Sequence, residues 1–171
     1  CLTYGTGIGG AIIMNGKVYK GSNGVAGEMG HMITHPNGLQ CGCSQRGCYE
    51  QYASTTALLR NVMNYDSNIR DGYAIFSEIE KGNQNIVNIV DDWIDEIILG
   101  LINLIYIFNP SCIVLGGGIM EQEYIMERIN KQIYNKIMSS FHGVKIVPAK
   151  LGNHAGIYGM VSIIEKSIKK S

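Results

Sequence analysis

One stretch decides the fold: Asn109-Pro110-Ser111-Cys112-Ile113-Val114-Leu115-Gly116-Gly117-Gly118. Before it, apolar residues recur at helical spacing from about residue 84 to residue 108, and the Asn-Pro pair ends that helix. Residues 112–115 predict a buried strand, and the three glycines lead from it into a helix expected over 121–138. Such a strand-to-helix turn is typical of an α/β sheet, in which ligands bind at the carboxyl ends of the strands. Gly116 and Gly117 are therefore candidate binding residues.

The rest of the chain alternates between strand and helix patterns. Further strands are predicted over 2–4, 11–14, 17–19, 29–33 and 145–147, and the Asn15-Gly16 pair predicts a hairpin. Further helices are predicted from Ser54 or Thr55 onward, over 73–81 and over 155–169. Together these elements predict an α/β fold with helices packed on a mixed sheet.

The composition excludes several classes of protein. Of 171 residues, 46% are hydrophobic, 16% are charged and 22 are glycine, so the chain is neither disordered nor of low complexity. The 14 basic and 14 acidic residues balance, which argues against nucleic-acid binding. The longest apolar stretch, 97–108, is too short to cross a membrane. Because the sequence starts at Cys1 inside a strand pattern, we expect it to be a piece of a longer chain. The low fraction of charged residues suggests that a partner covers part of its surface.

Three cysteines and a histidine form the strongest chemical signal. Cys41, Cys43 and Cys48 lie within eight residues, and His31 lies ten residues upstream of the first. Three thiolates and one imidazole are the ligand set of a closed, structural zinc site, and three cysteines cannot all pair as disulfides. His35 competes with His31 as the fourth ligand by proximity. Cys112, inside an apolar strand, is expected to be a core residue.

A glycine-rich segment near the start of the chain points to a phosphate. Residues 5–10 match G-x-G-x-x-G, and Glu28 falls near the place of a ribose-binding acid. A dinucleotide site needs a helix after these glycines, whereas a hairpin is predicted, so we reject that interpretation. Gly5 and Gly7 still allow close backbone approach and Thr6 adds a hydroxyl, which suits a phosphate cradle made of main-chain N–H groups.

Two glutamates flank the cysteine segment. Glu28 lies three residues before His31, and Glu50 two residues after Cys48, so a metal would bring the two carboxylates together. Held on a rigid scaffold, they could accept hydrogen bonds from the vicinal hydroxyls of a sugar. From the residues alone, however, two solvated surface glutamates are the favoured interpretation.

With these residues in view, the chain resembles the C-terminal half of proteins of the ROK family, which includes bacterial sugar kinases and sugar-responsive repressors. The resemblance rests on segments 5–10, 24–31, 41–50, 109–118 and 152–156, which occur in the family's order. It implies the actin-like ATPase (ribonuclease H-like) fold. Residues 1–171 would then be the single C-terminal lobe of a two-lobe sugar kinase, with a zinc loop over 31–50 and the N-terminal lobe absent from the chain.

The resemblance also implies roles for individual residues. It assigns zinc to His31, Cys41, Cys43 and Cys48, sugar binding to Glu28, His31 and Glu50, and nucleotide binding to Gly5, Thr6, Gly7, Gly116 and Gly117. One departure is Ser44, where the family usually has glycine. No catalytic residue is expected in this chain, because the family's aspartate base belongs to the N-terminal lobe.

The expected function is therefore ATP-dependent phosphorylation of a hexose or N-acetylhexosamine, with Mg²⁺ accompanying ATP and structural Zn²⁺. The alternative is the lobe of a sugar-sensing transcriptional repressor without catalysis. The resemblance further implies a cytoplasmic bacterial protein and a homodimer, with no membrane association and no nucleic-acid binding by this lobe. The apolar helix pattern over 84–108 agrees with a homodimer.

Overall fold

The computed structural model describes residues 1–152, 155 and 158–162. In this part of the chain the helices are α1 (Glu50–Ala53), α2 (Thr55–Tyr65), α3 (Gly72–Glu80), α4 (Gln84–Phe108) and α5 (Glu123–Lys136). The strands there are β1 (Leu2–Tyr4), β2 (Ile8–Gly10), β3 (Ile12–Met14), β4 (Lys17–Tyr19), β5 (Cys112–Gly116) and β6 (Lys145–Pro148). Most of the helix predicted over 155–169 lies outside the described residues.

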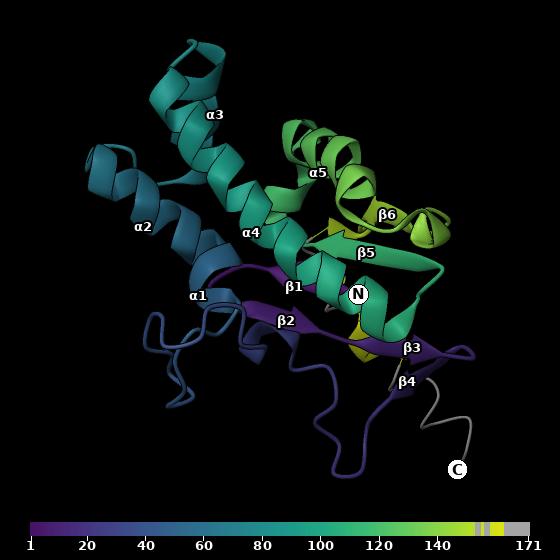
Figure 1. Ribbon diagram of the computed structural model, residues 1–171. Helices are drawn as coiled ribbons and strands as arrows, with labels where there is room; N and C mark the ends of the chain where they lie inside the picture. The colour runs from purple at the N-terminus through teal and green to yellow at the C-terminus, as the bar shows by residue number, and fades with distance from the viewer. Residues whose placement is uncertain (153–154, 156–157, 163–171) are drawn as a thin grey trace.

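A mixed sheet forms the centre of the described part, as predicted. Its four strands follow the order β2-β1-β5-β6, with β1 antiparallel to β2 and parallel to β5, and β5 parallel to β6. Helix α4 runs alongside β1 and β5, and α5 lies next to it (Figure 1). The α/β fold with helices packed on a mixed sheet is therefore confirmed.

The hairpin predicted at Asn15-Gly16 joins β3 and β4. Both residues have positive φ, 52° and 72°, as a two-residue hairpin turn requires. Strand β2 was not predicted, because its sequence Ile8-Gly9-Gly10 lacks an apolar pattern; its pairing with β1 (Tyr4 opposite Ile8) supplies the order that the local sequence does not.

Helix α4 spans the residues that its apolar pattern predicted. The Asn83 side chain caps its start by accepting from the Ile86 N–H at 3.4 Å, and Asn109 ends it with a left-handed φ of 41° before Pro110. Its buried side chains, which include Trp93, Ile97 and Leu101, form the middle of the core. Helix α2 begins as predicted after Ser54, whose hydroxyl accepts from the Ala57 N–H.

Three local predictions were wrong. The strand expected over 29–33 is a 3-10 helix, Met29–His31, because Gly30 packs directly on the Ile8 carbonyl and turns the chain there. Cys112 is exposed at the first position of β5, where the buried residues are Ile113, Leu115 and Gly116. The helix expected over 121–138 is divided into a 3-10 turn, Gly118–Glu121, and the shorter α5.

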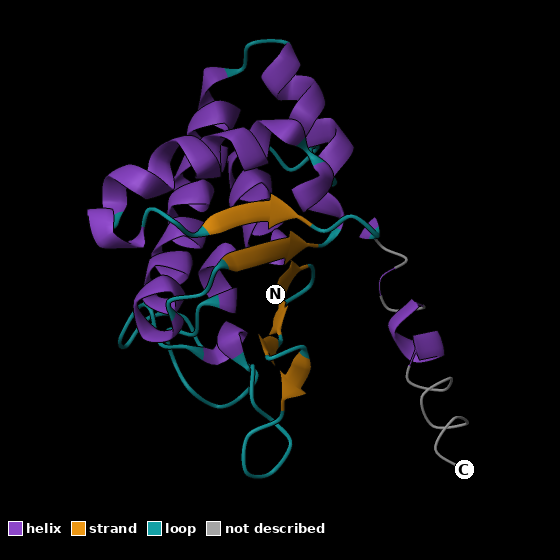
Figure 2. Cartoon of the chain, turned by 90° about the vertical axis from the view of Figure 1, so that its right-hand side faces the viewer, coloured by secondary structure: helices purple, strands orange, loops and turns teal. Residues whose placement is uncertain are grey.

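Long loop segments fill the region between β4 and α1. Figure 2 shows them at the end of the molecule opposite α3, beside the strands. None of the helices in the described residues is long and apolar enough to cross a membrane. The loop region contains Glu28, His31, His35 and the three clustered cysteines that the sequence singled out, and Glu50 follows as the first residue of α1.

Candidate functional site

A cleft of about 430 Å³ opens where β1 and β5 end. Residues from four separate segments line it: Thr3 to Gly9, Glu28 with His31, Glu50, and Gly117. The carboxyl ends of neighbouring parallel strands meet at one edge of a sheet, which explains why the two glycine segments lie together. The cleft therefore contains residues assigned to a sugar and residues assigned to a nucleotide.

The predicted zinc ligands lie together beside this cleft. One ligand atom from each of His31, Cys41, Cys43 and Cys48 lies within 4.8 Å of every other. The sulfurs of Cys43 and Cys48 are 3.5 Å apart, and the Cys41 sulfur is 3.7 Å from His31 Nδ1. Zinc bonds of about 2.3 Å to sulfur and 2.0 Å to nitrogen place tetrahedral neighbours roughly 3.5–3.8 Å apart. The donor set and its spacing thus fit a zinc ion.

Tight turns give the loop this shape. Ser44, where the resemblance implies a glycine, adopts a left-handed φ of 71° and donates its N–H to the Cys41 carbonyl at 3.1 Å. Gly47 has a φ of 81°, and a side chain there would overlap the His35 carbonyl. The departure at Ser44 therefore keeps the backbone conformation that a glycine would adopt more easily.

His35, the competing fourth ligand, is engaged elsewhere. Its ring stacks on Tyr52 with centroids 3.9 Å apart, and its Nε2 lies 3.3 Å from Glu96 Oε1. Its Nδ1 is 3.1 Å from the Thr34 hydroxyl. The geometry in the described residues favours His31.

The protonation of the thiols depends on their surroundings. Burial, followed by the neighbouring sulfurs of Cys43 and Cys41, raises the pKa of Cys48 to about 12. A backbone N–H of Gln45 lowers the pKa of Cys43. Three thiolates at this spacing repel one another, so a divalent cation is the partner that allows them to ionise together.

Glu50 and Glu28 lie on either side of His31. Glu50 Oε2 accepts from the Ile8 N–H at 3.4 Å, and its Oε1 lies 3.8 Å from His31 Nδ1 and accepts from the Cys41 thiol at 3.1 Å. Glu28 Oε2 lies 3.9 Å from the other ring nitrogen, Nε2. The structure thus brings together the three residues predicted to bind sugar, with Glu28 exposed and Glu50 largely covered.

The two glycine segments differ in what they offer the cleft. Gly5, Thr6, Gly7 and Gly117 line it, whereas Gly116 is the last residue of β5, pairs with Thr3 and does not. Gly117 has a φ of 100°, and a side chain there would overlap the Tyr4 carbonyl. Only glycine fits this turn without strain.

A second cavity, of about 300 Å³, adjoins this turn on the α3 side. Among the residues that line it, Thr55, Tyr73, Phe76, Gly118 and Ile119 were not predicted as site residues. Their signal in the sequence is weak, because they come from three distant segments and carry no motif. The aromatic side chains give this cavity a partly apolar wall.

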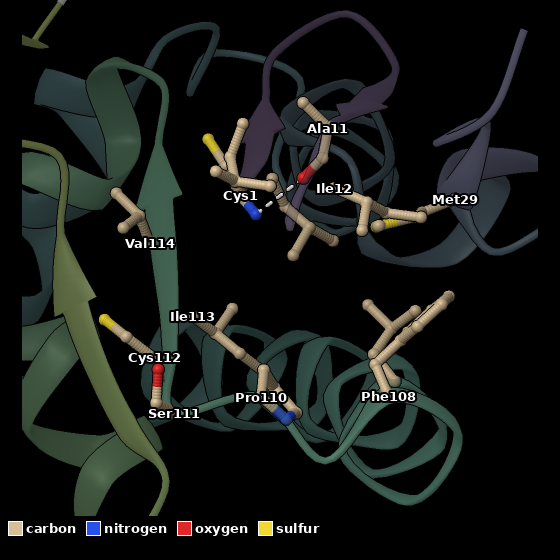
Figure 3. Close-up of a pocket in the computed structure, with 13 residues that line it drawn as sticks. Cys1, Ala11, Ile12, Met29, Phe108, Pro110, Ser111, Cys112, Ile113 and Val114 are labelled. Atoms are coloured by element: carbon tan, nitrogen blue, oxygen red, sulfur yellow. Dashed lines mark hydrogen bonds between the residues drawn. The ribbon is translucent and has the colours of Figure 1, made fainter. Parts of the chain in front are cut away.

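A third cavity, of about 350 Å³, lies apart from the cleft, between Ile12 and Ile113 (Figure 3). Apolar residues from β1, β3, the end of α4 and the start of β5 line most of it. At its rim the Cys1 amino group donates to the Ala11 carbonyl at 3.0 Å. It contains none of the residues predicted to bind sugar, nucleotide or zinc.

Several known proteins are similar to this chain in sequence or in fold along nearly its whole length. A glucokinase of Thermotoga maritima is 33% identical over 183 residues, covering 98% of this chain and 58% of that protein. A xylose repressor of Bacillus spizizenii is 32% identical, covering 93% of this chain and 42% of the repressor. The solved structure of a ROK family glucokinase from Streptomyces griseus, in complex with glucose and AMPPNP, superposes with a TM-score of 0.84 at 30% identity, covering 95% and 59% of the two chains.

The chain therefore spans little more than half the length of these kinases. Its fold is that of the ROK sugar kinases, an actin-like ATPase fold. The sequence model of the family matches residues 1–167. The chain belongs to the ROK family.

Proposed function

We propose that this chain is the sugar-binding lobe of a kinase that transfers the γ-phosphoryl group of ATP to a hexose or N-acetylhexosamine. One observation carries the proposal: a single cleft contains Glu28, His31 and Glu50 together with the glycine turns at Gly5–Gly7 and Gly117. Phosphoryl transfer needs the acceptor hydroxyl and the phosphate held side by side, and catalysis is mostly positioning and charge stabilisation. The kinase relatives support this assignment.

Two carboxylates and one imidazole would bind the sugar. Ionised carboxylates accept hydrogen bonds from hydroxyl groups, and these charge-assisted bonds are the stronger kind. With His31 Nδ1 toward the metal ligands, its Nε2, on the side of Glu28, is left for the sugar. Because the Ile8 N–H already orients Glu50, little entropy remains to be lost when the sugar binds.

The nucleotide would lie across the two glycine turns. Backbone N–H groups of Gly5–Gly7 and the Thr6 hydroxyl suit phosphate oxygens, and Mg²⁺ bound with ATP would neutralise their charge. The cavity beyond Gly117 offers Tyr73 and Phe76 to the adenine ring. We assign the catalytic base to a residue outside this chain, since the Glu50 carboxylate already accepts from the Ile8 N–H and is assigned to sugar binding.

The proposed metal is a structural zinc ion. Four protein ligands complete a tetrahedral shell and leave no position for substrate, so the ion would act through the fold alone. It would join His31 to Cys48, and thereby fix the residues on either side, Glu28 and Glu50. We thus propose that the zinc loop over 31–50 holds Glu28 and Glu50 in the positions from which they bind the sugar.

We propose that the chain is one lobe of a two-lobe kinase, since it covers 58% of the Thermotoga maritima glucokinase and 59% of the Streptomyces griseus one. The cavity in Figure 3 lies beside β1, between Ile12 and Ile113, and is separate from the proposed sugar and nucleotide sites.

A homodimer and a cytoplasmic location also belong to the proposal. Ile107 and Phe108, at the end of α4, are 68% and 45% exposed, which is high for large apolar side chains outside an interface.

The xylose repressor among the relatives supports the alternative function, in which the same lobe senses a sugar without catalysis.

The test is an assay of ADP release by the full-length, zinc-loaded protein with Mg²⁺-ATP. Glucose, N-acetylglucosamine and N-acetylmannosamine are offered in turn, and Glu28→Gln is compared with Glu80→Gln, a change on α3 away from the cleft. Sugar-dependent ADP release that falls in Glu28→Gln alone supports the kinase. Sugar binding without any ADP release would overturn the kinase assignment in favour of the sensor.

A further inference from the structure

Two tyrosines form a hydrogen-bonded chain through the core beneath the cleft. Tyr4 and Tyr49 are 1% and 0% exposed, and their rings meet edge to face with centroids 6.4 Å apart. Their hydroxyl oxygens are 2.9 Å apart, and the Tyr49 hydroxyl donates to the Ile97 carbonyl of α4, also at 2.9 Å. The chain thus links β1, the start of α1 and α4.

This chain has a direction. A tyrosine hydroxyl has one proton, and the proton of Tyr49 is given to Ile97, so Tyr4 must donate to Tyr49. Tyr49 is therefore the central member, bonded on both sides, and Tyr4 is the terminal one.

Both tyrosines adjoin the proposed site along the chain. Tyr4 directly precedes Gly5, and Tyr49 stands between the zinc ligand Cys48 and the carboxylate residue Glu50. The Tyr49 N–H donates to the Met32 carbonyl at 2.8 Å, one residue beyond His31. Whatever fixes Tyr49 therefore fixes the backbone from which Glu50 extends.

Helix α4 is shaped to receive the Tyr49 ring. Gly100 lies in the interior of this helix, and a side chain there would overlap the ring. A glycine in a helix interior costs about 1 kcal/mol relative to alanine. Gly100 therefore costs helix stability but leaves the space that the Tyr49 ring occupies, which is a second observation that α4 fixes the position of this ring.

We propose that Tyr49 is a positioning residue for sugar binding, holding Glu50 in register with the glycine turn through its bond to Ile97. This inference rests on the proposed function. It predicts that the hydroxyl of Tyr49 affects sugar affinity in protein that is folded and zinc-loaded, and that the hydroxyl of Tyr4 matters much less.

The experiment compares Tyr49→Phe with Tyr4→Phe in the full-length protein, by calorimetric titration with glucose in the absence of nucleotide. Tyr49→Phe is expected to raise the dissociation constant about fivefold or more at unchanged zinc content, because small displacements of binding groups are costly. Tyr4→Phe is expected to change it less than about twofold, since Tyr49 still donates to Ile97. Equal affinities in wild type and Tyr49→Phe, with only a lower unfolding temperature, would overturn the inference.

A second variant approaches the same contact from α4. Gly100→Ala is expected to push against the Tyr49 ring and weaken glucose binding, whereas Leu99→Ala, at an exposed neighbouring position, leaves it unchanged. Unchanged affinity in folded Gly100→Ala protein would also count against the inference, even if Tyr49→Phe did not fold. A wild-type protein that binds no sugar would instead overturn the proposed function, and this inference with it.

Discussion

Replacing Gly7 by alanine should weaken sugar binding while leaving the stability of the fold nearly unchanged. A Cβ atom at this position would lie 2.5 Å from Glu50 Oε2. The obstructing atom is the end of a flexible side chain, and the φ of Gly7 is not in the positive range, so the backbone can accept alanine. We expect the free energy of unfolding to change by less than about 1 kcal/mol, while the carboxylate is displaced.

The size of the effect follows from the distances. Ordinary contact begins at 3.4 Å, so Oε2 must retreat by about 0.9 Å. Its bond from the Ile8 N–H, already 3.4 Å long, is then lost, and with it the orientation toward the sugar. A hydrogen bond from a sugar hydroxyl to the Glu50 carboxylate would contribute about 1.5–3 kcal/mol, so its loss corresponds to roughly a 10- to 160-fold higher dissociation constant for the sugar. The long bond from Ile8 contributes little to the free energy of unfolding.

Calorimetric titration with glucose and thermal unfolding, on the same zinc-loaded samples, would measure both quantities. Gly5→Ala is the matched control, because a Cβ atom there meets nothing within 4 Å. Measured without nucleotide, it should bind glucose as the wild type does. If Gly7→Ala bound glucose with wild-type affinity, or if both variants lost the same amount of affinity, the argument that Gly7 makes room for the Glu50 carboxylate would be refuted.

Four further changes have separate expected outcomes. Cys43→Ala should abolish stoichiometric zinc, measured by atomic absorption, and weaken glucose binding, whereas Cys112→Ala, outside the cluster, should retain both. Gly117→Ala should lower the free energy of unfolding by more than about 1 kcal/mol in denaturant titrations, because its φ is positive. Tyr73→Ala, at an 87% exposed position, should raise the KM for ATP with little change in unfolding temperature. Burial raises the pKa of Glu96, so its ionisation opposes folding as pH rises through that pKa; Glu96→Gln should raise the unfolding temperature at pH 8 and not at pH 4.

The elements predicted correctly are those determined by residues close together in the chain. Helix α4 has its cap at Asn83, its apolar period and its stop at Asn109-Pro110 within one continuous stretch. The β3–β4 hairpin needs only a two-residue turn, and both Asn15 and Gly16 adopt the positive φ that the turn demands. Such signals do not depend on the rest of the fold.

The errors occur where distant segments decide the backbone or the burial. The segment at Met29 turns into a 3-10 helix because Gly30 meets the carbonyl of Ile8, some twenty residues earlier. Cys112 lies in an apolar run, but it stands at the start of β5 with its side chain exposed. For Gly30 the deciding contact is tertiary, and for Cys112 the burial depends on how β5 sits in the sheet, so no local pattern reports either.

The same distinction explains the candidate site. Residue types and spacing predicted His31, Cys41, Cys43 and Cys48 as one cluster, because three of them share one short loop. The residues were insufficient to choose between solvated and sugar-binding roles for the glutamates, since that depends on contacts with Ile8 and Gly7, more than forty residues before Glu50. In the proposed site these groups would constrain one another: Cys48 would hold Tyr49, Tyr49 would hold the backbone of Glu50, and the missing side chain of Gly7 leaves room for the Glu50 carboxylate. The proposed zinc loop and the glycine turn are far apart in the sequence, but both contribute residues to one cleft.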